Sequence, residues 1–176
     1  MRDDESMSLW DHITGECFEG PNINKRLPFW GVEITTVEAE LADYPHVTLI
    51  QSEKLPFHAR LMRIVFRKSM INKKETILMP HFRRSMNGDI DDRLPEGENG
   101  LGVMDEENNA KFYPIDAIKK GGSITDQWQG RELIITRGRI DGTPRARWAD
   151  TDEKPMQLLT RWYGFSFTYP GCEIFE

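Results

Sequence analysis

Charge is distributed unevenly along this chain, and the distribution limits how the chain can be organised. Residues 54–84 contain nine of the 23 Lys and Arg residues and a single acidic residue, Glu75, so this segment has a net charge of +8. The remaining residues include 14 basic and 28 acidic side chains and have a net charge of −14. This division predicts an acidic body around a basic insert, which either pairs with that body or binds a polyanion.

The length and composition are those of one compact, folded domain. The chain has 176 residues, within the usual domain size of roughly 100–200 residues, and 38% of them are hydrophobic. No apolar run approaches the ~18 residues that a membrane-spanning helix needs, and no apolar signal segment follows the N-terminus, so we expect a cytoplasmic protein. Two cysteines, Cys17 and Cys172, are too few for a disulfide scaffold or a zinc site built from Cys alone.

Local patterns in the N-terminal third predict one helix and one strand. Thr35 and Glu38 have the spacing of a capping box, which predicts a short helix at 36–43. Pro45 ends this helix, because proline cannot continue it. The β-branched run at 47–50 then predicts a buried strand.

The middle of the chain predicts a helical insert followed by a linker. Residues 59–70 lack Gly and Pro and contain Leu, Met and Arg, which favours a helix within the basic segment. A short helical turn is expected at 82–84. Residues 87–100 have the Gly, Asn and acidic composition of an exposed linker.

The C-terminal part predicts strands and two short helices. Four strands, of which the first two form a hairpin, are expected at 101–104, 110–113, 131–136 and 145–149. Pro114 suits the first position of a helix of about two turns that ends at Gly121. An aromatic-rich helix is expected at 158–167. The sequence therefore predicts an α+β fold, with a strand-rich antiparallel sheet, short helices and a basic helical insert.

Two segments, 44–50 and 169–175, share one pattern. Each begins with Tyr-Pro, continues through three further positions and ends on two apolar residues. Each also follows a predicted helix and leads into a predicted strand. The pattern indicates two copies of one helix-turn-strand corner.

Candidate catalytic residues gather near the N-terminus. Asp11, His12 and Cys17 lie within seven residues, and a Cys beside a His is the minimal pair for a nucleophile that a base activates. Asp126 is a further candidate for the same site. The alternative is structural, because Gly15 interrupts helical spacing here and a free Cys is commonly a small buried hydrophobic residue.

The other chemical signatures that a sequence can carry are few. The four histidines show no ligand spacing on a single helix or strand, namely His12, His46, His58 and His81. No Gly-rich phosphate loop, Gly-x-Ser-x-Gly elbow or His-Glu-x-x-His motif occurs. We therefore expect no metal site and no cofactor.

The basic insert is the candidate polyanion-binding surface. Its cations alternate with Phe57, Phe66 and Phe82, and charge combined with aromatic stacking suits phosphate polymers and single-stranded nucleic acid. The candidate residues are Arg60, Arg63, Arg67, Lys68, Arg83 and Arg84. No sequence-specific nucleic-acid motif is present, and internal pairing with the acidic body is the alternative.

Three groups of motifs carry a family resemblance. The first group comprises 8–16, Gly20-Pro21 and Tyr44-Pro45. The second group comprises 112–115, 124–126, Gly130 and 133–136, and the third group is 162–175. The first group resembles the C-terminal end of the bacterial family known as domain of unknown function 3179. The second group is similar to the N-terminal half of that family, and the third to its C-terminal corner.

The resemblance implies the tail of one family copy followed by a shortened second copy. The tail is expected at 1–53, the basic insert and linker at 54–100, and the second copy at 101–176, packed with the tail as one unit. Typical members carry a Cys-Pro-Leu-Cys-like segment where this chain has Arg-Gly-Arg at 137–139, so thiol or metal chemistry is not implied there. Members of the family are commonly exported or membrane-anchored, whereas we expect this chain to be cytoplasmic.

These observations favour a non-catalytic binding or interaction module, because no catalytic constellation is complete in the sequence. Its expected partner is a protein, or a polyanion at the basic insert. The alternative is an enzyme whose site is assembled around Asp11, His12 and Cys17.

Overall fold

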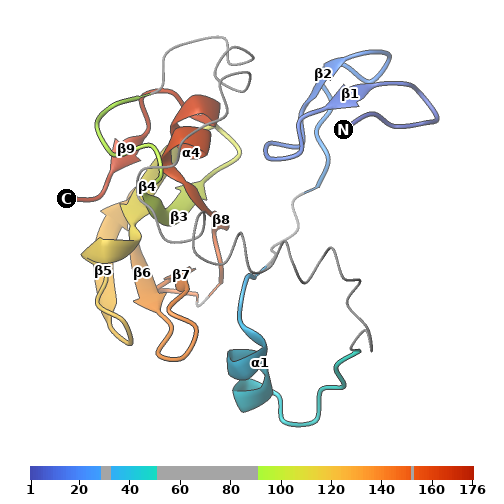
Figure 1. Cartoon of the computed structure of the whole chain (residues 1–176). Helices are drawn as coiled ribbons and strands as arrows, with labels where there is room; N and C mark the ends of the chain where they lie inside the picture. The colour runs from blue at the N-terminus through green and yellow to red at the C-terminus, as the bar shows by residue number, and fades with distance from the viewer. Residues whose placement is uncertain (29–32, 51–90, 152) are drawn as a thin grey trace, which may run out of the picture. The chain divides into compact units, whose positions relative to one another are not determined.

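A computed structural model of the chain describes residues 1–28, 33–50, 91–151 and 153–176. Its fold belongs to the strand-rich α+β class that the sequence predicts (Figure 1). The helix expected at 59–70, the turn expected at 82–84 and the six candidate polyanion-binding residues lie outside the described residues. Contacts divide the chain into an N-terminal unit, 1–32, and a C-terminal unit, 33–176.

The N-terminal unit is built on two short antiparallel strands, β1 (Leu9–Trp10) and β2 (Cys17–Glu19). Trp10 is buried, and its Nε1 donates a hydrogen bond to Asp3 Oδ2 at 2.7 Å. The Ser6 hydroxyl donates to both oxygens of the same carboxylate, at 2.8 Å each. Polar bonds of this kind supplement a very small hydrophobic core.

The described part of the C-terminal unit contains two sheets. The four-stranded sheet has the order β8 (Met156–Arg161), β3 (Asn99–Met104), β4 (Ala110–Pro114) and β9 (Glu173–Ile174). The three-stranded sheet has the order β5 (Ser123–Trp128), β6 (Arg131–Arg137) and β7 (Pro144–Trp148). Neighbouring strands are antiparallel except for β9, which runs parallel to β4.

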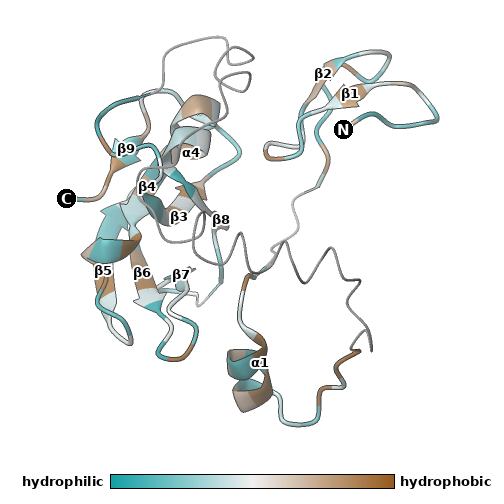
Figure 2. Cartoon of the chain, in the orientation of Figure 1, coloured by the Kyte–Doolittle hydropathy of each residue, from teal (hydrophilic) through white to brown (hydrophobic). Residues whose placement is uncertain are grey.

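Both sheets contribute to one hydrophobic core. Its buried members are Leu101, Val103, Tyr113, Ile118, Trp128, Leu133, Ile135 and Ala146. Figure 2 shows the hydrophobic middle of β6, from which two of these residues come. The Gln157 side chain on β8 donates to the backbone oxygen of Ala146 on β7 and accepts from its backbone N–H, which joins the two sheets at one edge.

The predicted helix at 36–43 is confirmed as α1 (Val37–Asp43), but its cap is one residue later than expected. The Thr36 side chain, rather than that of Thr35, accepts the hydrogen bond from Ala39 N. Thr35 instead donates its hydroxyl hydrogen to Asp141 Oδ2 at 3.1 Å. A tertiary partner thus takes the side chain that local spacing assigned to the cap.

The expected helix at 158–167 is wrong in its first half. Residues up to Arg161 belong to β8, and the helix α4 (Trp162–Thr168) begins only after them. Leu159 pairs with Leu101 of β3, and this pairing outweighs the local helix preference of the leucines.

The two-turn helix expected after Pro114 is also wrong. Only the 3-10 turn η1 (Ile115–Ala117) forms, and the next residue, Ile118, is extended and fully buried.

The four predicted strands are confirmed as β3, β4, β6 and β7. The linker expected at 87–100 extends too far towards the C-terminus, because it overlaps the start of β3. Asn99 and Gly100 already belong to β3. A side chain at Gly100 would place its Cβ 2.4 Å from a ring carbon of Phe112, so glycine is needed for close packing rather than for a turn. The strand β5 was not expected, because the charged Asp126 interrupts the alternation of Ile124 and Trp128.

The buried strand expected at 47–50 is wrong. This segment has no regular secondary structure and no partner strand among the described residues, and the side chain of Ile50 is 98% exposed. A β-branched run favours a strand only when another strand supplies its hydrogen bonds.

Candidate functional site

Two of the three catalytic candidates in the N-terminal unit, Asp11 and Cys17, form local hydrogen bonds. Asp11 Oδ1 accepts hydrogen bonds from Ile13 N at 2.8 Å and Thr14 N at 2.7 Å, which hold the turn between β1 and β2. Burial raises the pKa of the Asp11 carboxyl, but hydrogen bonds from Thr14 and Ile13 lower it more, so the pKa lies below its ordinary value. Cys17 is buried and its Sγ donates to the Glu19 carbonyl at 3.3 Å, whereas His12 is exposed.

Asp126 lies in the C-terminal unit, in a group that the sequence did not reveal. Its Oδ2 accepts a hydrogen bond from the Tyr113 hydroxyl at 2.8 Å and lies 2.7 Å from Lys111 Nζ. Lys111 also lies 3.5 Å from Glu173 Oε2. Burial, followed by the hydrogen bond to the negatively charged Asp126, raises the pKa of Tyr113 well above its ordinary value. The four side chains join β4, β5 and β9, and the Lys111 ammonium group lies between two carboxylates.

No metal centre emerges from the part of the chain that is described. There, no group of three or more His, Cys, Asp and Glu side chains lies close enough together to hold a metal ion. His46 is exposed, and His58 and His81 lie outside the described residues. Within the described ranges, no helix is both long and apolar enough to cross a membrane.

Two segments of the C-terminal unit have a similar helix and turn but differ in burial. We define the α1 corner as residues 37–50 and the α4 corner as residues 162–175. Each has a seven-residue helix that ends at a tyrosine, with φ −128° and ψ 76° at Tyr44 and φ −121° and ψ 74° at Tyr169. A turn follows in both, closed by a 3.1 Å bond from Val47 N to Tyr44 O and by one of equal length in the α4 corner.

The helix face of the α4 corner is buried. Trp162, Ser166 and Tyr169 are each at most 5% exposed. The ring centroid of Phe165 lies 5.6 Å from that of Phe112 on β4, and the chain then continues into β9. The β4 strand and its aromatic side chain thus cover this corner.

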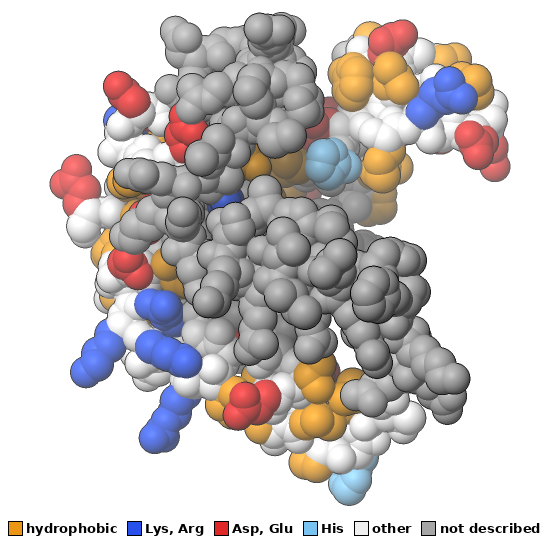
Figure 3. All heavy atoms as spheres, viewed as in Figure 1, with side chains coloured by type: hydrophobic (Ala, Val, Ile, Leu, Met, Phe, Trp, Pro, Cys, Tyr) orange, Lys and Arg blue, Asp and Glu red, His pale blue; other side chains and the backbone are white. Residues whose placement is uncertain are grey.

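The same face of the α1 corner is uncovered. Val37, Leu41 and Tyr44 occupy the matching positions, and their exposed fractions lie between 39% and 62%. The position that corresponds to Phe165 holds Glu40. Figure 3 shows hydrophobic and acidic side chains side by side at the surface over α1. Exposed apolar side chains grouped on one face are a common feature of interaction sites.

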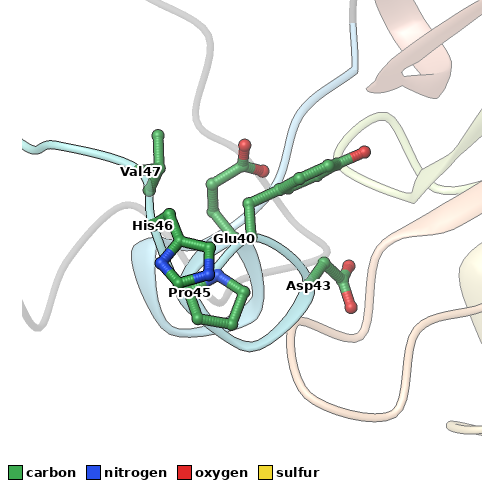
Figure 4. A pocket seen from close by; sticks show the side chains of 6 residues that line it. Glu40, Asp43, Pro45, His46 and Val47 are labelled. Carbon is green, nitrogen blue, oxygen red and sulfur yellow. The ribbon is translucent and has the colours of Figure 1, made fainter.

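A shallow hollow of about 490 Å³ lies at the end of α1. Glu40, Asp43, Tyr44 and His46 are among the residues that line it. Figure 4 shows the side chains of Glu40 and Asp43 projecting from the helix, beside Pro45 and His46 of the turn that follows. Two carboxylates beside an aromatic ring form a setting that suits a cationic side chain.

Comparison of the chain with family models, with curated proteins and with solved structures gives no match. The Tyr-Pro repeat was the sequence signal that pointed to the two corners, but it did not reveal that one is covered and the other exposed.

Proposed function

We propose that this protein is a non-catalytic interaction module that binds a protein partner through its α1 corner. The observation that carries the proposal is the contrast between two corners whose helices have the same length and similar backbone angles at the tyrosine that ends each one. The α4 corner buries its helix face against β4, while Val37, Leu41 and Tyr44 of the α1 corner are exposed. A helix of this length gains most of its stability from packing, so an uncovered face favours a partner.

The chemistry of the other candidate residues supports the same proposal. Asp11 is engaged in holding a turn, Cys17 donates to a backbone carbonyl, and Asp126 is paired with Lys111. The hydrogen-bond partner of the Cys17 thiol is the Glu19 carbonyl and not His12, the base that the enzyme alternative requires.

The resemblance to domain of unknown function 3179 fits this proposal as well. On that interpretation, the two corners correspond to the C-terminal corners of two family copies. The second copy supplies the sheet that covers the α4 corner. The α1 corner then depends on a sheet or groove supplied by a partner.

The test is site-specific photo-crosslinking in the native host. A photoreactive phenylalanine derivative replaces Leu41 or Tyr44 in separate variants, and Phe18, an exposed residue of the N-terminal unit, serves as the control position. We expect Leu41 and Tyr44 to give the same covalent product and Phe18 not to give it. Absence of a shared product from the two α1-corner positions would overturn the proposal.

A further inference from the structure

The chemistry of the α1 corner narrows the kind of partner that it can bind. Segment 33–50 contains Glu33, Glu38, Glu40 and Asp43 and no Lys or Arg. Because Glu40 replaces the phenylalanine of the α4 corner, the covering surface must offer a cation where β4 offers Phe112. The partner surface should therefore combine cations with an exposed apolar side chain.

The chain itself presents such a surface at one end of the three-stranded sheet. Lys119 and Lys120 follow η1, Arg139 and Ile140 lie between β6 and β7, and all four are exposed. We call these four residues the basic end. No ion pair involves its three cations among the described residues, although the chain outside 54–84 is strongly acidic. Figure 3 shows Lys and Arg side chains gathered on the lower left of the molecule.

The two loops of the basic end are held in place by Arg137. Its Nη1 donates to the carbonyl oxygens of Ile115 and Ile118 at 3.0 Å each, and its Nε donates to Gly142 O at 3.0 Å. Gly121 N also donates to Arg137 O at 2.9 Å. This bonding gives the cations a stable backbone, which reduces the entropy lost when a partner binds.

The acidic residue of the same loops does not cancel the charge of the basic end. The side chain of Asp141 is only 2% exposed and lies 2.5 Å from Arg145 Nη2. It also accepts hydrogen bonds from Thr143 N and from Thr35. Lys119, Lys120 and Arg139 therefore face solvent without a carboxylate partner among the described residues.

We infer that the α1 corner of one copy docks on the basic end of a second copy of this chain. The inference rests on the proposed function and names its partner. Within one copy, no ion pair joins Glu38, Glu40 or Asp43 to the basic end among the described residues. Both surfaces belong to the C-terminal unit, so a two-fold dimer makes the contact twice.

In this dimer, a cation of the basic end of one copy binds in the hollow at the α1 corner of the other copy. Lys120 or Arg139 from the second copy enters between the carboxylates of Glu40 and Asp43, next to the Tyr44 ring. Ile140, which is 42% exposed, meets the apolar face formed by Val37 and Leu41. The contact therefore combines salt-sensitive ion pairs with apolar burial.

A charge-swap experiment on the full chain tests this inference by sedimentation velocity over a wide concentration range. Glu40→Lys with Asp43→Lys, or Lys120→Glu with Arg139→Glu, should each raise the dimer dissociation constant at least about tenfold. All four substitutions together leave the net charge unchanged and should restore dimerisation. Raised salt should weaken the wild-type dimer.

The matched control is Glu107→Lys with Glu153→Lys. It makes the same charge change as Glu40→Lys with Asp43→Lys, at exposed positions outside both surfaces. It should leave the dissociation constant unchanged, and circular dichroism checks that every variant is folded. A monomeric wild-type chain, a dimer that either charge reversal leaves intact, or a fourfold variant that stays monomeric would each overturn the inference. A crosslinked product with a different protein would overturn it while supporting the proposed function.

Discussion

The Tyr113 hydroxyl donates a hydrogen bond to Asp126 Oδ2 at 2.8 Å, and this bond links the two sheets of the C-terminal unit. Lys111 Nζ approaches the same oxygen at 2.7 Å, and the side chains of Lys111 and Asp126 are only 11% and 15% exposed. One carboxylate thus compensates a largely buried ammonium group and a buried hydroxyl. The charge of Lys111 would lose its nearest partner if Asp126 were neutral.

We therefore expect Asp126→Asn to lower the free energy of unfolding by about 3 kcal/mol, the lower end of the usual cost of breaking a buried pair, because Lys111 keeps only the more distant and more exposed Glu173 as a partner. Urea denaturation measures the change. The control is Asp150→Asn, which removes the partner of Arg131 in an exposed ion pair and should change stability little. Equal effects of the two substitutions would contradict this account of the Lys111 group.

Asp141 should make the protein sensitive to acid. Burial raises its pKa, but hydrogen bonds from Arg145, Thr143 N and Thr35 lower it more, to about 2 from 3.8. Because the folded pKa lies below the unfolded one, the stabilisation is present above about pH 4 and is lost as the pH falls towards 2. The Asp141→Asn variant should therefore lose less stability than the wild type as the pH falls through this range. Urea denaturation midpoints from pH 6 to pH 2 measure the difference. A parallel pH dependence in the variant would contradict the prediction.

Gly102 should not tolerate a side chain. A Cβ at this position of β3 would lie 2.1 Å from a ring carbon of Phe165 on α4. Gly102→Ala should therefore lower the free energy of unfolding by about 3 kcal/mol, the upper part of the usual cost of overpacking. Gly130→Ala is the control, since its Cβ meets nothing within 4 Å and it bears only the strain of φ +73°. Thermal unfolding should show the larger loss for Gly102→Ala, and the smaller side chain in Phe165→Leu should recover part of it.

The Cys172 thiol should be unreactive in the folded protein. Burial raises its pKa to about 11, although the nearby Arg93 lowers it in part. Since the thiolate is the reactive form, alkylation at pH 8.5 should be much slower in the folded chain than in urea. Mass spectrometry of the peptide that contains Cys172 measures both rates. Equal rates in the two states would show that this thiol is not protected.

The sequence by itself determined the elements whose signals lie within a few neighbouring residues. The Thr and Pro residues around α1 predicted its ends to within one residue, and the β3–β4 hairpin followed from two apolar runs around a short polar turn. The shared Tyr-Pro pattern follows a helix at both places, as expected, although the strand expected after its first copy does not form. Capping and turn formation are local, so they can be inferred from local residue types.

Only the tertiary structure decided the features that depend on distant partners. Leu159 is in a strand because Leu101 pairs with it, and Gly102 is required because Phe165 crosses it. The tyrosines that end the two helices have similar backbone angles, yet Tyr169 is buried and Tyr44 is exposed. Burial depends on which surfaces meet in space, and residues far apart in the sequence make that choice.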